Sequence, residues 1–137
     1  RIAQTIIAAP GSSNYFKGGI VSYTNEVKEN LLHVDHATLE EFTAVSEPVA
    51  KQMVIGACNA LNVDYAIACT GVAGPGGGTP QNPVGTIWIA YGSKDDIRTI
   101  KLTEDEGRDM NISTATCTAL RAFLEYYKEK NPQPVEE

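Results

Sequence analysis

Two residues that could move a proton stand where an expected strand passes into an expected helix. Tyr23 and Lys28 enclose the stretch YTNEVK, and Lys28 falls in the first turn of that helix. The partial positive charge at a helix N-terminus disfavours an ammonium ion and therefore favours the neutral amine. If the side chain is also buried, Lys28 can act as a general base near neutral pH, and the Tyr23 hydroxyl can relay or donate the proton. An exposed helix lysine would have the same spacing, so that interpretation stays open.

A second candidate is the glycine-rich stretch TGVAGPGGGTP at residues 70–80, directly after the apolar run YAIAC. It contains five of the twelve glycines in the chain. Glycine permits positive φ and lets a ligand approach backbone N–H groups that a Cβ would shield. Successive N–H groups can bind a phosphate or a developing oxyanion. The candidate substrate-binding residues here are Thr70, Gly71, Gly74, Gly76, Gly77 and Gly78. On composition alone, a flexible surface turn is an equal alternative.

Two familiar phosphate-binding motifs do not fit this stretch. Thr79 follows Gly77 and Gly78 and no lysine comes next, so the pattern GxxxxGK[ST] is absent. The dinucleotide-binding spacing also fails, because Pro80 and Pro83 prevent a helix from starting promptly. Any anion would therefore be bound by local backbone geometry.

Three further residues are candidates for the substrate. Arg108 follows Gly107 near an expected helix start and could bind a phosphate bidentately, although a lone arginine is usually a surface residue. Ser12 and Ser13 lie in a turn whose N–H groups could serve the same phosphate.

The cysteines and histidines argue against a metal site. Cys58, Cys69 and Cys117 are far apart, each inside an apolar or helical stretch and without metal-ligand spacing. We expect buried, reduced thiols and a cytoplasmic protein. His33 and His36 have no Cys, Asp or Glu constellation to complete a site, so we expect surface or packing roles. The sequence therefore predicts no metal and no other cofactor.

Composition limits the class of protein. The chain has 137 residues, 42% hydrophobic and 20% charged, which suits one domain with a single core. No apolar run approaches the roughly 20 residues of a membrane span. The net charge of -6 argues against a broad nucleic-acid surface, which would cluster Lys and Arg. We expect a small-molecule partner, with no nucleic acid and no membrane.

Periodicity and capping signals give the elements that must position these residues. Helices are expected at 1–9, at 26–32 after the cap Asn25, at 36–42, from Ser46 onward and at about 109–128. The apolar face expected for the helix after Ser46 comprises Val49, Met53, Ala57, Ala60 and Leu61. Strands are expected at 18–23, 65–69, 85–91 and 97–102, with Asp95 and Asp96 in the last turn. Residues 129–137 are expected to fray.

Helices that flank apolar strands favour an α/β fold, a three-layer α/β/α sandwich with a mainly buried mixed sheet. In such folds ligands usually bind at loops beyond the carboxyl ends of strands. The glycine-rich stretch occupies such a place.

With these segments in order, residues 1–127 resemble the CinA C-terminal domain family, whose activity is nicotinamide-nucleotide amidase. The resemblance rests on PGSSNYFKGGIVSYTNEVK, AVSEPVA, TGVAGPGGGTPQNPVGTIWIAYG and the short GRD at residues 107–109. It implies hydrolysis of nicotinamide mononucleotide to nicotinic acid mononucleotide and ammonia, in pyridine-nucleotide salvage. The family is thought to use a serine nucleophile helped by a tyrosine and a lysine, which Tyr23 and Lys28 match. A homodimer is a further expectation from the family.

The serine is where this sequence departs from the family pattern. The family places it in a Ser-Cys-Thr-Gly-Gly type motif just before the helix that opens here at Arg1. We therefore expect a single domain over 1–137 that lacks its N-terminal strand and nucleophile segment, and assign no nucleophile within it. Two alternatives remain, a nucleotide-binding module without catalysis and a regulatory domain.

Overall fold

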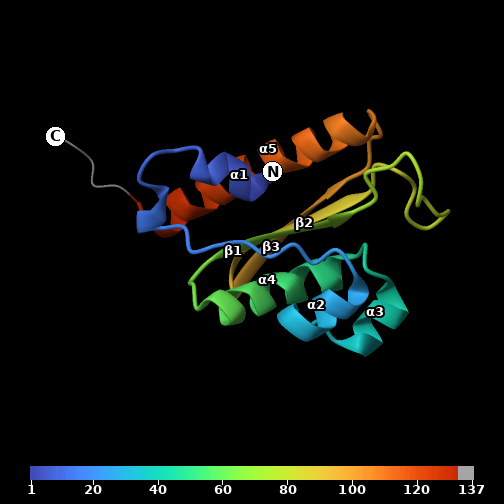
Figure 1. Ribbon diagram of the computed structural model, residues 1–137, viewed down its shortest axis with the longest axis horizontal. Helices are drawn as coiled ribbons and strands as arrows, with labels where there is room; N and C mark the ends of the chain where they lie inside the picture. Colours follow the sequence, from blue (N-terminus) through green and yellow to red (C-terminus); the bar gives the residue numbers. More distant parts are fainter. Residues whose placement is uncertain (133–137) are drawn as a thin grey trace.

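The structure is a computed structural model and describes residues 1–132. Within this range the chain forms five α-helices, one 3-10 turn and three strands (Figure 1). In chain order these are α1 (Ile2–Ile7), η1 (Ser12–Asn14), α2 (Asn25–Leu32), α3 (His36–Phe42), α4 (Glu47–Leu61), β1 (Ala66–Gly71), β2 (Ile87–Ser93), β3 (Asp96–Leu102) and α5 (Arg108–Lys130).

The sheet has the strand order β1-β2-β3, and both pairs are antiparallel. The expectation of a mixed sheet is therefore wrong for the described residues. Ser93 pairs with Asp96 across the β2–β3 hairpin, so the turn lies at Lys94 and Asp95, one residue before the expected Asp95–Asp96 turn.

The segment 18–23 is also a correction, because the structure contains no strand there. In Figure 1 the segment runs as a blue coil toward α2. The side chains of Val21 and Tyr23 are 86% and 83% exposed. β-branched and aromatic residues indicate an extended, partly buried segment, but strand pairing also requires a neighbouring edge.

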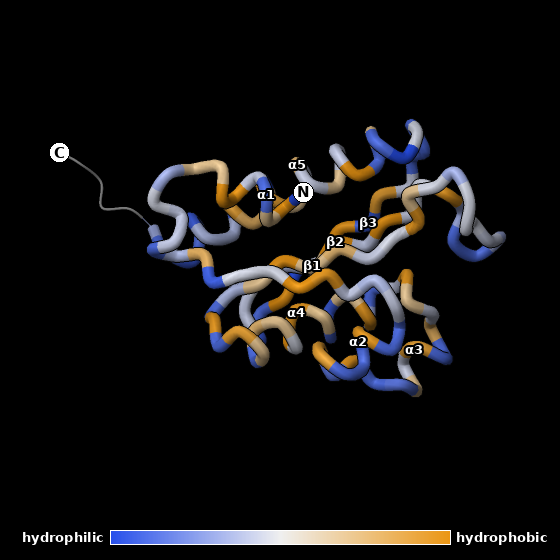
Figure 2. Tube along the Cα trace, viewed as in Figure 1, coloured by the Kyte–Doolittle hydropathy of each residue, from blue (hydrophilic) through white to orange (hydrophobic). Residues whose placement is uncertain are grey.

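Helices cover both faces of this sheet, which gives the expected three layers (Figure 1). Helix α4 packs on one face, with α2 and α3 outside it, and α1 and α5 lie over the other face. Strand β2 alternates between the layers: Ala90 is buried with α4, whereas Ile89 and Tyr91 are buried with α5. Figure 2 shows the hydrophobic residues gathered along the strands. The core is thus divided into two clusters by the sheet.

Helix α4 shows how sequence periodicity translates into packing. Its buried residues are Val49, Ala50, Met53, Val54, Gly56 and Cys58. Ala60 was expected on this face but is exposed. Gly56 allows α2 to approach, because a Cβ at this position would lie 2.0 Å from the carbonyl oxygen of Leu32. The close contact of the two helices therefore depends on a glycine.

Two helix boundaries differ from the expectation. Thr24 rather than Asn25 caps α2, since the Thr24 hydroxyl accepts a hydrogen bond from the Val27 N–H. Helix α5 begins at Arg108 and continues to Lys130, so residues 129 and 130 are helical rather than frayed. Residues 133–137 of the expected tail lie outside the described residues.

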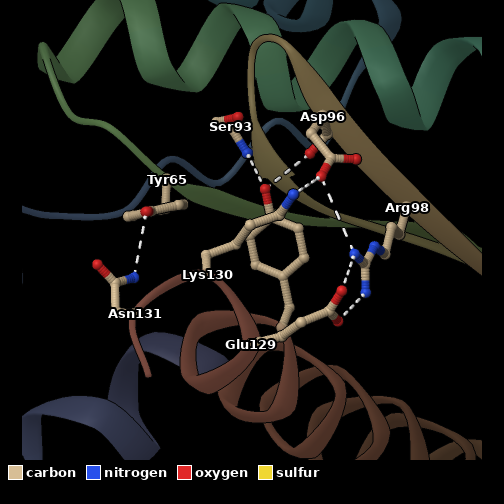
Figure 3. A network of polar contacts seen from close by, with 8 residues as sticks. Tyr65, Ser93, Asp96, Arg98, Glu129, Lys130 and Asn131 are labelled. Carbon is tan, nitrogen blue, oxygen red and sulfur yellow. Dashed lines mark hydrogen bonds and ion pairs between the residues drawn. The ribbon is translucent and has the colours of Figure 1, made fainter. Parts of the chain in front are cut away.

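The C-terminal end of α5 is fixed to the β2–β3 hairpin by a polar network around Tyr126 (Figure 3). The buried Tyr126 hydroxyl donates to the Asp96 carbonyl at 2.9 Å and accepts from the Ser93 N–H at 3.3 Å. Arg98 binds both carboxylate oxygens of Glu129, at 2.8 and 3.0 Å. This network orients the long helix whose first turn contacts the candidate site.

Over residues 1–132, no helix is long and apolar enough to cross a bilayer.

Candidate functional site

The first half of the candidate site is the lysine at the start of α2. The Thr24 cap makes Lys28 the fourth residue of this helix, within its first turn. The side chain is only 7% exposed, and its Nζ donates a hydrogen bond to the Ser22 carbonyl at 2.7 Å. Burial lowers the pKa of Lys28, because removing the amine from water disfavours its charged form. This is the direction in which the pKa of a lysine must move for it to serve as a general base.

Tyr23 has a different environment. Its side chain is 83% exposed, whereas Lys28 is buried. The carbonyl that accepts from Lys28 belongs to the peptide unit joining Ser22 to Tyr23. The structure therefore brings the backbone next to Tyr23 to the amine, while the Tyr23 ring extends toward solvent.

The second half is the glycine loop, residues 72–80, which follows β1. The ladder continues one residue past the strand, because the Val72 N–H donates to the Thr86 carbonyl at 2.9 Å and the Gly85 N–H donates to the Val72 carbonyl at 2.8 Å. A Cβ on Gly71 would lie 2.6 Å from Ile87, so glycine is required where the loop leaves the sheet. The chain then projects beyond the end of the sheet (Figure 1).

The loop presents backbone donors. Over residues 1–132, the N–H groups of Ala73, Gly74 and Gly76 to Gly78 donate no hydrogen bond. Gly76, Gly77 and Gly78 are exposed, whereas Gly74 is buried. A buried N–H without an acceptor is rare in folded proteins, because it costs free energy comparable to a lost hydrogen bond. These donors suit an anionic oxygen.

The start of α5 binds the opposite side of the loop backbone. Arg108 donates from Nη1 to the Gly74 carbonyl at 2.8 Å. Asn111 donates from Nδ2 to the Ala73 carbonyl at 3.0 Å. Arg108 was expected as a phosphate ligand. In the structure, one of its guanidinium nitrogens donates to a carbonyl of the loop instead. Sequence reasoning missed Asn111, although an asparagine on the inner face of a predicted helix is a signal that could have identified it.

Thr70 contributes a structural contact. Its side chain is buried, and Oγ1 donates to the Ala44 carbonyl at 2.7 Å. Beyond the loop, Asn82 donates from Nδ2 to Thr43 Oγ1 at 3.1 Å. The segment before α4 therefore supports both ends of the glycine loop.

Ser12 and Ser13 lie elsewhere. They form η1 after α1, at the end of the molecule opposite the glycine loop (Figure 1). Ser12 is buried, and its carbonyl accepts from the N–H groups of Tyr15 and Phe16 at 3.0 and 2.7 Å. The structure thus does not bring this turn to the other candidate residues.

The histidines and cysteines lie outside the candidate site. His36 is exposed and pairs with Glu29 and Glu40. The hydrogen bond that the protonated His36 ring donates to the Glu29 carboxylate, together with the negative charge of that carboxylate, raises the pKa of His36. Cys58 is buried, but Cys117 is exposed, so the expectation of three buried thiols is wrong. Within the described residues, no group of three or more His, Cys, Asp or Glu side chains is arranged to bind a metal ion.

Two surface cavities lie apart from the lysine and the loop. One, of about 250 Å³, is bordered by β2, β3 and the start of α5 and includes Asn111 in its lining. The other, of about 470 Å³, lies near Tyr65 and Lys94. Neither is lined by Lys28 or the glycine loop. Within residues 1–132, no hydrogen bond joins Lys28 to the glycine loop, so the base and the backbone donors are two separate candidate features.

Comparison with known proteins gives a consistent picture. Residues 1–127 match the family described as the CinA C-terminal domain. The chain is 55% identical over 95 residues to a CinA-like protein of Leptospira borgpetersenii, an alignment that covers 69% of this chain. The chain spans only about a quarter of that relative's length, since the alignment covers 23% of it.

Solved structures agree in fold. The competence/damage inducible protein CihA from Agrobacterium tumefaciens matches with a TM-score of 0.87 at 35% identity, over 90% of this chain and 76% of that chain. The competence damage-inducible protein A (ComA) from Klebsiella pneumoniae matches with a TM-score of 0.88 at 30% identity, over 96% and 81%.

Proposed function

Because the chain belongs to the CinA C-terminal domain family, we propose that it forms the catalytic domain of a nicotinamide-nucleotide amidase. The reaction is hydrolysis of the carboxamide of nicotinamide mononucleotide to nicotinic acid mononucleotide and ammonia. The nucleophile is a serine in the protein segment that precedes Arg1, as the family motif implies.

The observation that carries this proposal is the buried amine of Lys28. A lysine with its ordinary pKa of about 10.4 is almost fully protonated at neutral pH and cannot accept a proton. Burial in the first turn of α2 moves the pKa of Lys28 downward, toward the range in which a general base works. A lysine needed only for solubility would gain nothing from burial, because desolvation of its charge costs free energy.

The proposed chemistry proceeds through an acyl-enzyme. Neutral Lys28 removes the proton from the serine hydroxyl, and the serine oxygen bonds to the amide carbon as the carbonyl π electrons move onto oxygen. The protonated lysine returns the proton to the amide nitrogen, and the C–N bond breaks to release ammonia. Water then hydrolyses the ester and restores the serine. Tyr23 could relay the proton if its ring turns inward from its exposed position.

The glycine loop would stabilise the negative charge. Its free N–H groups suit the oxyanion of the tetrahedral intermediate, which needs donors that are already oriented. The exposed N–H groups at residues 76 to 78, with the remaining donors of Arg108, are candidates for the 5′-phosphate of the nucleotide.

The experiment is an ammonia-release assay on the complete protein with nicotinamide mononucleotide as substrate. Release of one ammonia per nicotinic acid mononucleotide formed supports the amidase. Thermal stabilisation by the nucleotide without ammonia release would contradict it, and would favour a nucleotide-binding module. If the nucleotide neither stabilises the protein nor is turned over, the result would point to a regulatory domain.

A further inference from the structure

We infer that Asn111 is a positioning residue, which orients the Ala73–Gly74 peptide so that the Gly74 N–H faces the reacting carbonyl. This inference rests on the proposed amidase function. Asn111 lies in the first turn of α5, whereas the peptide it binds belongs to the loop between β1 and β2.

The Asn111 side chain is held in one orientation. It is only 4% exposed. Its Nδ2 donates to the Ala73 carbonyl at 3.0 Å and to Asp105 Oδ1 at 2.9 Å, and its Oδ1 accepts from the Glu106 N–H at 2.8 Å. A flipped amide would place an oxygen against two acceptors and an NH₂ against a donor. The neighbouring groups therefore direct the NH₂ toward the loop.

The geometry of the Ala73–Gly74 peptide determines the direction in which the Gly74 N–H points. In a trans peptide the C=O and the next N–H point to opposite sides. Because Asn111 binds the Ala73 carbonyl, the Gly74 N–H points away from α5. Gly74 is a buried residue, and its N–H donates no hydrogen bond within residues 1–132. A donor without an acceptor is suited to an oxygen that arrives with the substrate.

Because Gly74 is flexible, the loop needs a second hydrogen bond, which Arg108 donates to the Gly74 carbonyl. Gly74 has φ of 86°, in the left-handed region that glycine enters without steric cost. A peptide flanked by such a residue can rotate easily between two orientations, and the reversed one would aim a carbonyl at the oxyanion. Arg108 binds the Gly74 carbonyl at 2.8 Å, so α5 holds two successive carbonyls on its own side.

The first test observes the loop directly, without substrate, by NMR of the ¹⁵N-labelled protein. In the wild type we expect one set of amide resonances for Ala73, Gly74 and Gly76. Asn111→Asp preserves side-chain size and the acceptor for Glu106 but removes the donor. We expect doubled or exchange-broadened resonances for these three residues, because exchange between two peptide orientations broadens amide signals on the microsecond-to-millisecond timescale and doubles them when it is slower. A single unperturbed set in Asn111→Asp would overturn the inference.

The matched control lies on the same helix. Thr116 is buried, and its Oγ1 donates to the Ile112 carbonyl at 2.8 Å, within α5 and away from the loop. Thr116→Val should lower Tm yet leave the loop resonances single. Equal doubling in Thr116→Val would mean that any weakening of α5 disturbs the loop, and would overturn the specific role of Asn111. Asn111→Ala serves as a second variant if the aspartate variant fails to fold.

The second test separates kcat from KM in the complete protein. Loss of one oxyanion donor lowers kcat by roughly a hundredfold or more, so misorientation by Asn111→Asp should lower kcat at least about tenfold with KM little changed. Thr116→Val should stay within about twofold of the wild type when assayed well below its Tm. Equal kcat in Asn111→Asp and wild type would overturn the inference. Absence of ammonia release by the wild type would instead contradict the proposed function, and the NMR result would still decide the role of Asn111.

Discussion

Nζ of Lys28 lies 2.7 Å from the carbonyl oxygen of Ser22, so the first turn of α2 is bonded to the segment that leads into it. This contact holds the amine against the segment that leads into α2, and only 7% of Lys28 is exposed. The Ser22 carbonyl can accept a hydrogen bond from Lys28 in either protonation state, whereas burial disfavours the charged form and lowers the pKa of Lys28. The arrangement thus holds the side chain in place while favouring its neutral form.

The pH dependence of stability tests this directly. Because the folded pKa of Lys28 is lowered, the unfolded chain binds more protons between that pKa and the ordinary value of about 10.4. Wild-type stability should therefore rise, relative to Lys28→Met, as pH increases from the lowered pKa of Lys28 toward about 10. The measurement is Tm of both proteins across this range, with Lys17→Met as the control at an exposed lysine. A Tm difference that stays constant with pH would show that Lys28 titrates normally.

Two glycines of the loop region should respond differently to alanine. At Gly71 a Cβ would lie 2.6 Å from Ile87, so Gly71→Ala should destabilise the fold by about 1–3 kcal/mol. At Gly76 a Cβ meets nothing within 4 Å, and Gly76→Ala should leave Tm near that of the wild type. If the exposed N–H groups there bind the nucleotide, Gly76→Ala should still lower kcat/KM several-fold. Wild-type kcat/KM in Gly76→Ala would remove residue 76 from the binding surface.

The close packing of α2 and α4 at Gly56 predicts that alanine at this position lowers stability, whereas helix propensity alone predicts a gain. Gly→Ala inside an exposed helix stabilises by up to about 1 kcal/mol. At Gly56 the new Cβ would lie 2.0 Å from the Leu32 carbonyl oxygen, so α2 would have to move away from α4. We expect Gly56→Ala to lose about 1–3 kcal/mol in urea unfolding. A gain in stability would show that the two helices are not in close contact.

The network at the end of α5 contains both buried and exposed polar contacts, whose contributions to stability can be compared. Tyr126→Phe removes the donor to Asp96 and the acceptor for the Ser93 N–H, at a residue only 2% exposed, and should cost about 1–3 kcal/mol. Glu129→Gln disrupts an exposed ion pair with Arg98, which solvent screens, and should cost less stability than Tyr126→Phe. Chemical denaturation of both variants gives the comparison. A larger loss for Glu129→Gln would contradict the structure of this network.

Much of the fold was predictable because its signals are local. Helix α3 matches the expected range 36–42, since its periodicity and the following turn residues lie within a few positions. The segment 18–23 was predicted wrongly as a strand, because residue types report an extended backbone but not the presence of a neighbour to pair with. The mixed sheet was wrong for a related reason, since strand direction depends on connections that residue types do not encode.

The candidate site was less predictable because its contacts are distant in sequence. Lys28 was identifiable from its place after a strand-like segment and a helix cap. Its burial depends on how the entry segment folds over α2, which spacing alone left open. The bond from Asn111 to Ala73 joins residues 38 positions apart, and that from Arg108 to Gly74 joins residues 34 apart. Such pairs cannot be read from one sequence, so the contact of Arg108 with the loop was not predicted and Asn111 was overlooked.

The most direct test of the central claim is ammonia release from nicotinamide mononucleotide by the complete protein and by its Lys28→Met variant. The wild type should release ammonia, with kcat rising with pH through the lowered pKa of Lys28, because the base must be neutral. Lys28→Met should lose kcat by roughly a hundredfold or more while KM stays within a few-fold of the wild type. An unchanged kcat in a folded Lys28→Met protein would contradict the role of Lys28 as the base.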